Sequence, residues 1–166
     1  MSRQANTSQS LNGWLWLFPP VYLLHLIDER YFGIGTAEWA SHHTGVYFTN
    51  SVWLAVNAPS FVLLTLATWL VARRTWPMWV AVALATHLAL HAIGRVVGSV
   101  VFDSVSPGVV TGVILCLPLA VFAYTRLVRV LSRGQLLAGV LAGVVSLQPL
   151  WHALLLPVLP SGAPAA

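Results

Sequence analysis

Charged residues are scarce in this chain, and lysine is absent altogether. Only 7% of its 166 residues are charged, whereas 58% are hydrophobic. A soluble globular domain carries about 25% charged residues, so this chain has too few polar groups to cover a surface that faces water. The composition excludes an ordinary soluble domain and indicates a protein whose solvent is the lipid bilayer.

The chain also has a single cysteine, Cys116, which lies within an apolar run. One cysteine excludes an internal disulfide framework and a zinc site built from cysteines. All eight basic residues are arginines, and with four acidic residues they give a net charge of +4. Most of these arginines fall in short loops. Their distribution indicates membrane topology, and we expect no binding of nucleic acid.

Long apolar segments are what the chain does have. A transmembrane helix needs about 20 apolar residues. The segments that approach this length are 11–27, 51–72, 77–101, 107–124 and 135–157. Turn-forming sequences separate them, and Ser106-Pro107 is typical of a helix N-cap followed by its first residue. We predict an all-α fold, a polytopic membrane helix bundle with about five transmembrane helices, as a single domain over residues 1–166.

The connection between the first two segments, residues 31–50, is too rich in aromatic residues for a solvated loop. We expect an interfacial or re-entrant segment that covers the outer mouth of the bundle, with a short helix capped by Thr36 and Glu38 in its first turn. Most arginines fall at the opposite end of a five-helix arrangement; they are Arg3, Arg73, Arg74, Arg126, Arg129 and Arg133. The positive-inside rule then predicts a multi-pass cell-membrane protein with a cytoplasmic N-terminus and an external C-terminus.

Ionisable residues gather at the end of the first apolar segment, where His25, Asp28 and Glu29 are spaced i, i+3 and i+4. This spacing puts them on one face of a helix. An ionisable group near mid-bilayer costs roughly 2.5–3.5 kcal/mol on translocon scales. A cluster of such groups therefore predicts a functional site.

A second polar stripe lies on the third segment, where His87, His91 and Arg95 are spaced i, i+4 and i+8. Counting ~1.5 Å per residue places His25 and His91 at a similar depth, each ~21 Å from the start of its helix. Asn57 on the second segment falls in the same half of the bundle. We predict that His25, Glu29, His87 and His91 are metal ligands. The candidate catalytic residues are His25, Asp28, Glu29, Asn57 and Arg95, with Arg95 as the partner of a carboxylate.

These motifs resemble the HXXEE-domain family of integral membrane proteins. The motif that names the family matches His25-Leu26-Ile27-Asp28-Glu29, with Asp28 in place of the first glutamate. The Asn57-Ala58 pair and the run from Pro107 to Thr111 are similar as well. The resemblance covers most of the chain and implies a membrane fold and a site at these residues, without implying a settled activity.

Two classes of function are consistent with these residues. The first is a small membrane enzyme acting on a hydrophobic small-molecule substrate, either with a divalent metal such as zinc or iron or with metal-free acid–base chemistry by His25 and a carboxylate. The alternative is a non-enzymatic carrier, permease subunit or accessory binding protein. A purely structural polar cluster is the third hypothesis.

The lipid bilayer is the expected partner of this chain. Glycines recur at four-residue spacing in three of its segments: Gly94 and Gly98, Gly108 and Gly112, and Gly139 and Gly143. Such pairs allow close approach of membrane helices. They predict either packing within one bundle or a homodimer.

Overall fold

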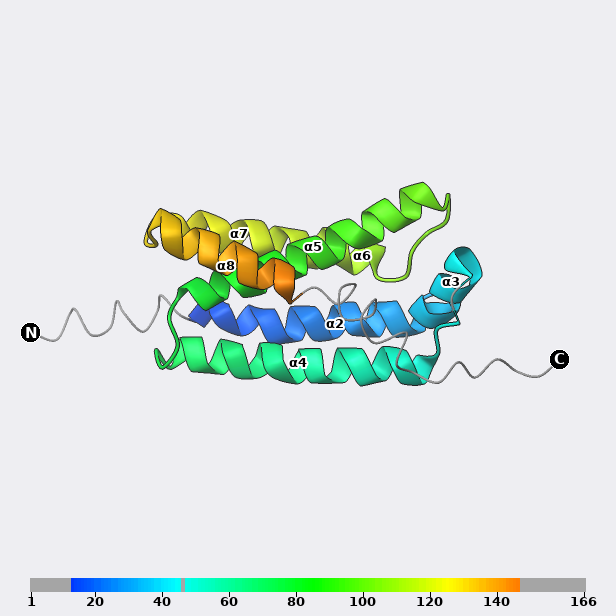
Figure 1. Ribbon diagram of the computed structural model, residues 1–166, viewed down its shortest axis with the longest axis horizontal. Helices are drawn as coiled ribbons and strands as arrows, with labels where there is room; N and C mark the ends of the chain where they lie inside the picture. The colour runs from blue at the N-terminus through cyan, green and yellow to red at the C-terminus, as the bar shows by residue number, and fades with distance from the viewer. Residues whose placement is uncertain (1–12, 46, 147–166) are drawn as a thin grey trace, which may run out of the picture.

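The computed structural model describes residues 13–45 and 47–146, and all regular structure within these ranges is helical (Figure 1). In chain order the elements are η1 (Gly13–Leu17), α2 (Phe18–Tyr31), α3 (Gly35–Thr44), α4 (Asn50–Ala72), α5 (Trp79–Val101), α6 (Val109–Thr111), η2 (Gly112–Cys116), α7 (Leu117–Leu127) and α8 (Arg133–Val145). The predicted all-α helix bundle is confirmed.

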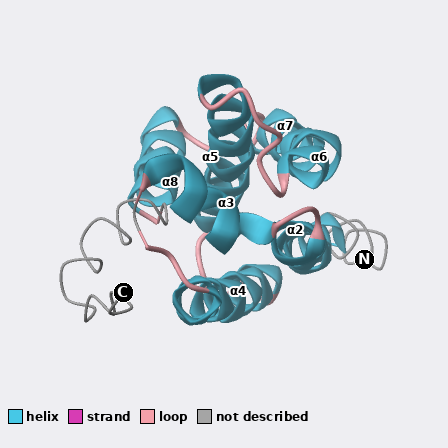
Figure 2. Cartoon of the chain, turned by 90° about the vertical axis from the view of Figure 1, so that its right-hand side faces the viewer, coloured by secondary structure: helices cyan, strands magenta, loops and turns pink. Residues whose placement is uncertain are grey.

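The long helices form two groups that run along the same axis. α2 packs against α4, and α5 packs against α7 and α8 (Figures 1 and 2). α2 also contacts α6 and η2, so it joins the two groups. α3 lies at the end of the bundle where α2 ends and α4 begins, as predicted for the segment between the first two helices.

α2 begins in a way that its sequence explains. Pro19 and Pro20 lie in its first turn. Backbone N–H groups in the first turn have no intrahelical partner, so the N–H that proline lacks costs no hydrogen bond there. The preceding residues form the 3-10 helix η1. α2 then continues to Tyr31, four residues beyond the predicted end of the first apolar segment. His25, Asp28 and Glu29 therefore belong to one helix.

Thr36 does not cap α3, so this prediction is wrong. The N-cap is Ile34, without a side-chain hydrogen bond, and Glu38 lies in the first turn as expected. The Thr36 hydroxyl donates instead to the backbone carbonyl of Glu29 at 3.0 Å. This bond ties α3 to the end of α2 that carries the polar motif.

The fourth helical stretch begins at Val109, two residues later than the Ser106-Pro107 sequence predicts. Gly108 stands before it with φ of 85°, a left-handed conformation that L side chains rarely adopt. The stretch continues through the π-helical turn η2 into α7. π-turns inside α-helices are frequent at functional sites.

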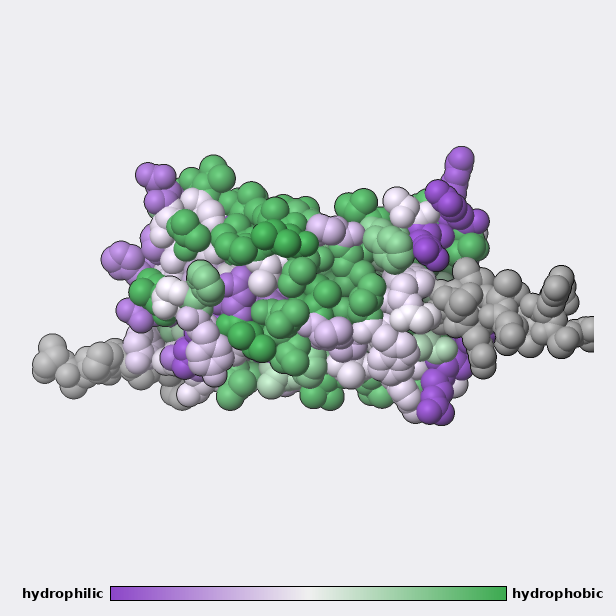
Figure 3. Space-filling model, turned by 180° about the vertical axis from the view of Figure 1, so that it is seen from behind, coloured by the Kyte–Doolittle hydropathy of each residue, from purple (hydrophilic) through white to green (hydrophobic). Residues whose placement is uncertain are grey.

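Among the described residues, three helical stretches are long and apolar enough to cross a membrane: Asn50–Ala72, Trp79–Val101 and Val109–Leu127. A helix of 23 residues is ~34 Å long, which exceeds the ~30 Å hydrocarbon core of a bilayer. α8 is apolar but shorter, and the predicted fifth segment from residue 147 onward lies outside the described residues. Hydrophobic residues form a broad middle band between more hydrophilic ends (Figure 3). These features are typical of a membrane protein.

Candidate metal centre

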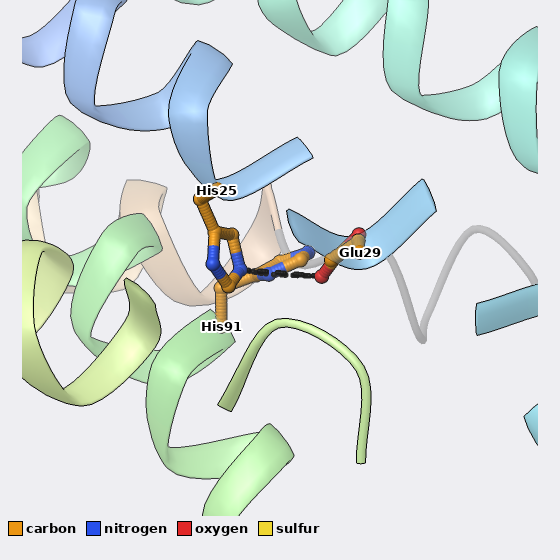
Figure 4. A group of neighbouring side chains, drawn as sticks. All are labelled: His25, Glu29 and His91. Atoms are coloured by element: carbon orange, nitrogen blue, oxygen red, sulfur yellow. Dashed lines mark hydrogen bonds and ion pairs between the residues drawn. The ribbon is translucent and has the colours of Figure 1, made fainter. Parts of the chain in front are cut away.

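Three side chains from two helices meet inside the bundle. His25 and Glu29 lie one turn apart on α2, and His91 reaches them from α5 (Figure 4). The His25 Nε2 atom is 3.0 Å from His91 Nδ1 and 3.2 Å from Glu29 Oε1, and His91 Nδ1 is 3.3 Å from the same oxygen. His25 and Glu29 are fully buried, and His91 is 7% exposed. The group is therefore shielded from the surroundings.

Further contacts hold both carboxylate oxygens of Glu29. The Arg95 guanidinium donates from Nε at 2.8 Å and places Nη2 2.6 Å from Oε1. The indole Nε1 of Trp53 on α4 donates to Oε2 at 3.3 Å. Glu29 thus joins α2, α4 and α5. The predicted role of Arg95 as a carboxylate partner agrees with this geometry.

Thr111 connects the second carboxylate of the motif to His25. Its backbone N–H and its hydroxyl both donate to Asp28 Oδ2, at 3.0 Å and 2.7 Å. Its Oγ1 lies 2.9 Å from His25 Nδ1. Thr111 therefore links Asp28 by hydrogen bonds to the group formed by His25, Glu29 and His91.

These bonds assign the proton on His25. A hydroxyl has one hydrogen; when Thr111 gives it to Asp28 Oδ2, the shorter of its contacts, His25 Nδ1 is the donor to Thr111 Oγ1. A neutral His25 then presents the lone pair of Nε2 to His91 and Glu29. This arrangement is typical of metal-binding histidines, whose second ring nitrogen donates to an oxygen that fixes the tautomer.

The charges of the described groups around these ligands also favour a cation. Asp28 and Glu29 carry two negative charges when ionised, and Arg95 supplies one positive charge. With neutral imidazoles, the cluster has a net charge of −1. A proton or a metal ion would compensate that charge, which is costly in a low-dielectric interior.

The spacing of the three ligand atoms fits a metal ion. Zinc binds nitrogen and oxygen ligands at about 2.0–2.1 Å, and a tetrahedral arrangement at that bond length separates neighbouring ligand atoms by about 3.3 Å. The observed separations are 3.0–3.3 Å. Two histidines and one carboxylate are the protein ligands of many catalytic zinc sites and of non-heme iron(II) oxygenases.

The structure does not bring His87 into this group, although the sequence pattern predicts it as a fourth ligand. His87 lies one turn from His91 on α5, and its Nδ1 is 3.1 Å from the Ser146 hydroxyl of the α8 C-terminus. Its ring packs edge-on against Tyr22. His87 therefore borders the group without sharing its centre.

Asn57, another predicted site residue, also lies beside the group. It is 2% exposed, and its Nδ2 donates to the backbone carbonyl of Trp53 at 2.8 Å. Asn57 thus supports the turn of α4 that presents Trp53 to Glu29.

Three residues of the site were not predicted as site residues. Thr111 had two signals, a polar side chain in an apolar run and its place in the Pro107–Thr111 run that resembles the family. Trp53 carried none, because tryptophans are common near membrane interfaces. Gly108 has a clear structural role, since a Cβ atom there would lie 2.6 Å from Glu29 Cγ and 3.0 Å from His25 Cε1.

Comparison with known protein families places the chain in one of them. Residues 16–123 match the family described as "Protein of unknown function with HXXEE motif". The match covers more than half of the chain, which therefore belongs to this family. Comparisons with curated proteins and with solved structures gave no significant match.

Proposed function

We propose that this protein is a multi-pass membrane enzyme in which His25, Glu29 and His91 bind a divalent metal such as zinc or iron. Its substrate would be a lipid-soluble small molecule. The observation that carries the proposal is the convergence of three ligand atoms within 3.0–3.3 Å of one another in a buried site. Buried ionisable groups inside a membrane bundle are costly and usually functional.

Each neighbouring residue has a role in this proposal. A bound metal would supply a Lewis acid and could lower the pKa of water. Arg95 and Trp53 hold the Glu29 carboxylate in place. Thr111 and Asp28 keep the Nε2 lone pair of His25 directed into the site. Asp28 accepts two hydrogen bonds and is a candidate proton acceptor.

Metal content of the purified protein tests the proposal. We expect about one zinc or iron ion per chain, consistent with one group of three ligands, and loss of that ion in His91→Ala. His87→Ala is the matched control, because it removes a histidine from the same helix face outside the group. A metal-free wild-type protein, or equal metal content in His91→Ala, would contradict the proposal.

The second candidate is metal-free acid–base catalysis. It is supported by the chain of hydrogen bonds from Asp28 through Thr111 to His25. In that reaction His25 would transfer a proton while a carboxylate stabilises the charged imidazole. Full activity in metal-free protein, with loss of activity in His25→Ala, would favour this mechanism once a substrate is found.

We further propose that the protein lies in the cell membrane with a cytoplasmic N-terminus. The support is the distribution of arginines among the described residues: the α4–α5 loop contains Arg73 and Arg74, and the α7–α8 region contains Arg126, Arg129 and Arg133. Both loops lie at the end of the bundle opposite α3 (Figure 1). This end would face the cytoplasm.

A further inference from the structure

A groove runs between α2 and α4 on the side of the bundle next to the candidate metal centre. It has a volume of about 450 Å³. Apolar side chains such as Leu23, Ile27 and Leu54 line it and are 43–58% exposed. The groove is thus open sideways, toward the acyl chains of a surrounding bilayer.

The groove is most polar at one end and has its charged residue there, and Asn57 adds one more polar side chain farther along. Arg30, Asn50 and Ser51 lie at the end near α3, and Leu23 and Phe61 lie at the other. Among the lining residues that the structure describes, one is basic and none is acidic. This end therefore complements a negative charge.

The length of the groove matches one leaflet of a membrane. Its α4 wall extends from Asn50 to Phe61, which is ~17 Å at 1.5 Å per residue. The hydrocarbon core is about 30 Å thick, so the groove covers about half of it. An acyl chain anchored at the polar end would lie along the groove and reach the middle of the bilayer.

The groove also borders the candidate metal centre. Trp53 and Asn57 line it, and the Trp53 indole donates to Glu29 Oε2 on the other side. Trp53 lies three residues from Asn50, near the polar end. A molecule bound with its head at the polar end would therefore place its head region, and not its tail, beside Trp53. Trp53 separates the groove from Glu29.

We infer that the groove binds a single-chain amphiphile with an anionic head, of the long-chain carboxylate type. Its head lies at Arg30 and its chain lies between α2 and α4. This inference rests on the proposed function, since it names the class of substrate that the metal centre would receive from the membrane.

Photolabelling tests the inference on the full chain in lipid nanodiscs. The probe is a long-chain fatty acid with a photoreactive diazirine in mid-chain, and a probe of equal length that ends in an alcohol is its neutral counterpart. We expect the acid to label residues of α2 and α4 that line the groove. Arg30→Gln should reduce labelling by the acid about tenfold, as expected for the loss of one charge-assisted hydrogen bond. It should leave labelling by the alcohol unchanged.

Two tryptophan substitutions form a matched pair for the groove itself. Ala58 lines the groove, whereas Ala55 is exposed on the same helix outside it. Ala58→Trp should block labelling by the acid, and Ala55→Trp should not. Equal labelling of the two variants, labelling elsewhere in the chain, or equal labelling of the wild type by acid and alcohol would overturn the inference.

The metal centre is tested separately from the groove. In His91→Ala the groove lining is intact, so labelling by the acid should persist even though the metal is lost. Persistent labelling in a protein that never contains metal would support the groove and refute the metal proposal. Loss of labelling in Ala58→Trp, with full metal content, would support both.

Discussion

Glu29 is the residue that links the other members of the site. Its Oε1 lies within 3.3 Å of nitrogen atoms from His25, His91 and Arg95, and its Oε2 accepts from Trp53. The carboxylate is fully buried, while the Arg95 side chain is 18% exposed. Breaking a buried ion pair by removing one partner is costly, because the other charge then lacks compensation.

Substitution Glu29→Gln should therefore reduce both stability and metal binding. We expect the free energy of unfolding to fall by about 3 kcal/mol and the metal to be lost. Unfolding in mixed detergent micelles and metal analysis measure the two effects. Glu38→Gln is the control, since Glu38 is exposed on α3. The double variant Glu29→Gln/Arg95→Gln should recover part of the stability, and strictly additive losses would contradict the ion pair.

Thr111 gives a second prediction for a single residue. Thr111→Val keeps the size of the side chain but removes the hydroxyl between Asp28 and His25. Loss of a residue that hydrogen-bonds to a metal ligand typically lowers metal affinity 10–100-fold, and we expect a loss in that range. A competition titration with a chelator measures it. Thr111→Ser retains the hydroxyl and should retain the affinity; equal affinity in the valine and serine variants would exclude this positioning role.

At the scale of the elements, α5 organises the bundle through close contacts made by glycines. Gly139 and Gly143 of α8 face it, and a Cβ atom at Gly143 would collide with Thr86 and with the Ala83 carbonyl. A Cβ atom at Gly112 would lie 3.2 Å from Ala92 Cβ of α5, which is a tight contact. Gly112, Gly139 and Gly143 thus pack within one chain, whereas Gly94 has nothing within 4 Å of an added Cβ atom.

Gly143→Ala should therefore destabilise the bundle, by about 1–3 kcal/mol as is usual for overpacking. Gly94→Ala adds the same methyl group to α5, where nothing lies within 4 Å of the new atom. It should be neutral, or stabilising by up to about 1 kcal/mol from helix propensity. Unfolding midpoints in detergent measure both. If Gly143→Ala instead dissociates a dimer without lowering the stability of the monomer, the glycines act between chains.

The elements also show how far the sequence can predict this structure. The apolar segments 51–72 and 77–101 correspond closely to α4 and α5, because both are long apolar runs that end at turn-forming sequences. The end of α2 was less predictable, since its last turn is charged and depends on contacts with Thr36 and Thr111. The pairing of His25 with Glu29 follows from helical spacing. The spacing does not predict that His91, and not His87, joins them. Both histidines share one face of α5, and only the packing of α5 against α2 distinguishes them.

At the scale of the whole molecule, the charged side chains of the described residues divide between the ends of the bundle and the buried site. The α3 segment lies at one end, and the α4–α5 and α7–α8 loops lie at the other (Figure 1). In the proposed multi-pass arrangement, alternate loops lie on opposite sides of the bilayer. The candidate metal centre lies nearer the α3 end, which the proposed orientation places outside the cell.

Thiol labelling in intact cells tests this orientation. Cys116 is fully buried, so the wild-type chain should not react with a membrane-impermeant maleimide. Tyr47 in the α3–α4 loop is 65% exposed and Val130 in the α7–α8 loop is 71% exposed. Tyr47→Cys should react in intact cells, and Val130→Cys only after permeabilisation, because the proposed orientation places the arginine-rich loop around Val130 in the cytoplasm. The reverse result would invert the orientation, and reaction of both in intact cells would refute the alternating arrangement of loops.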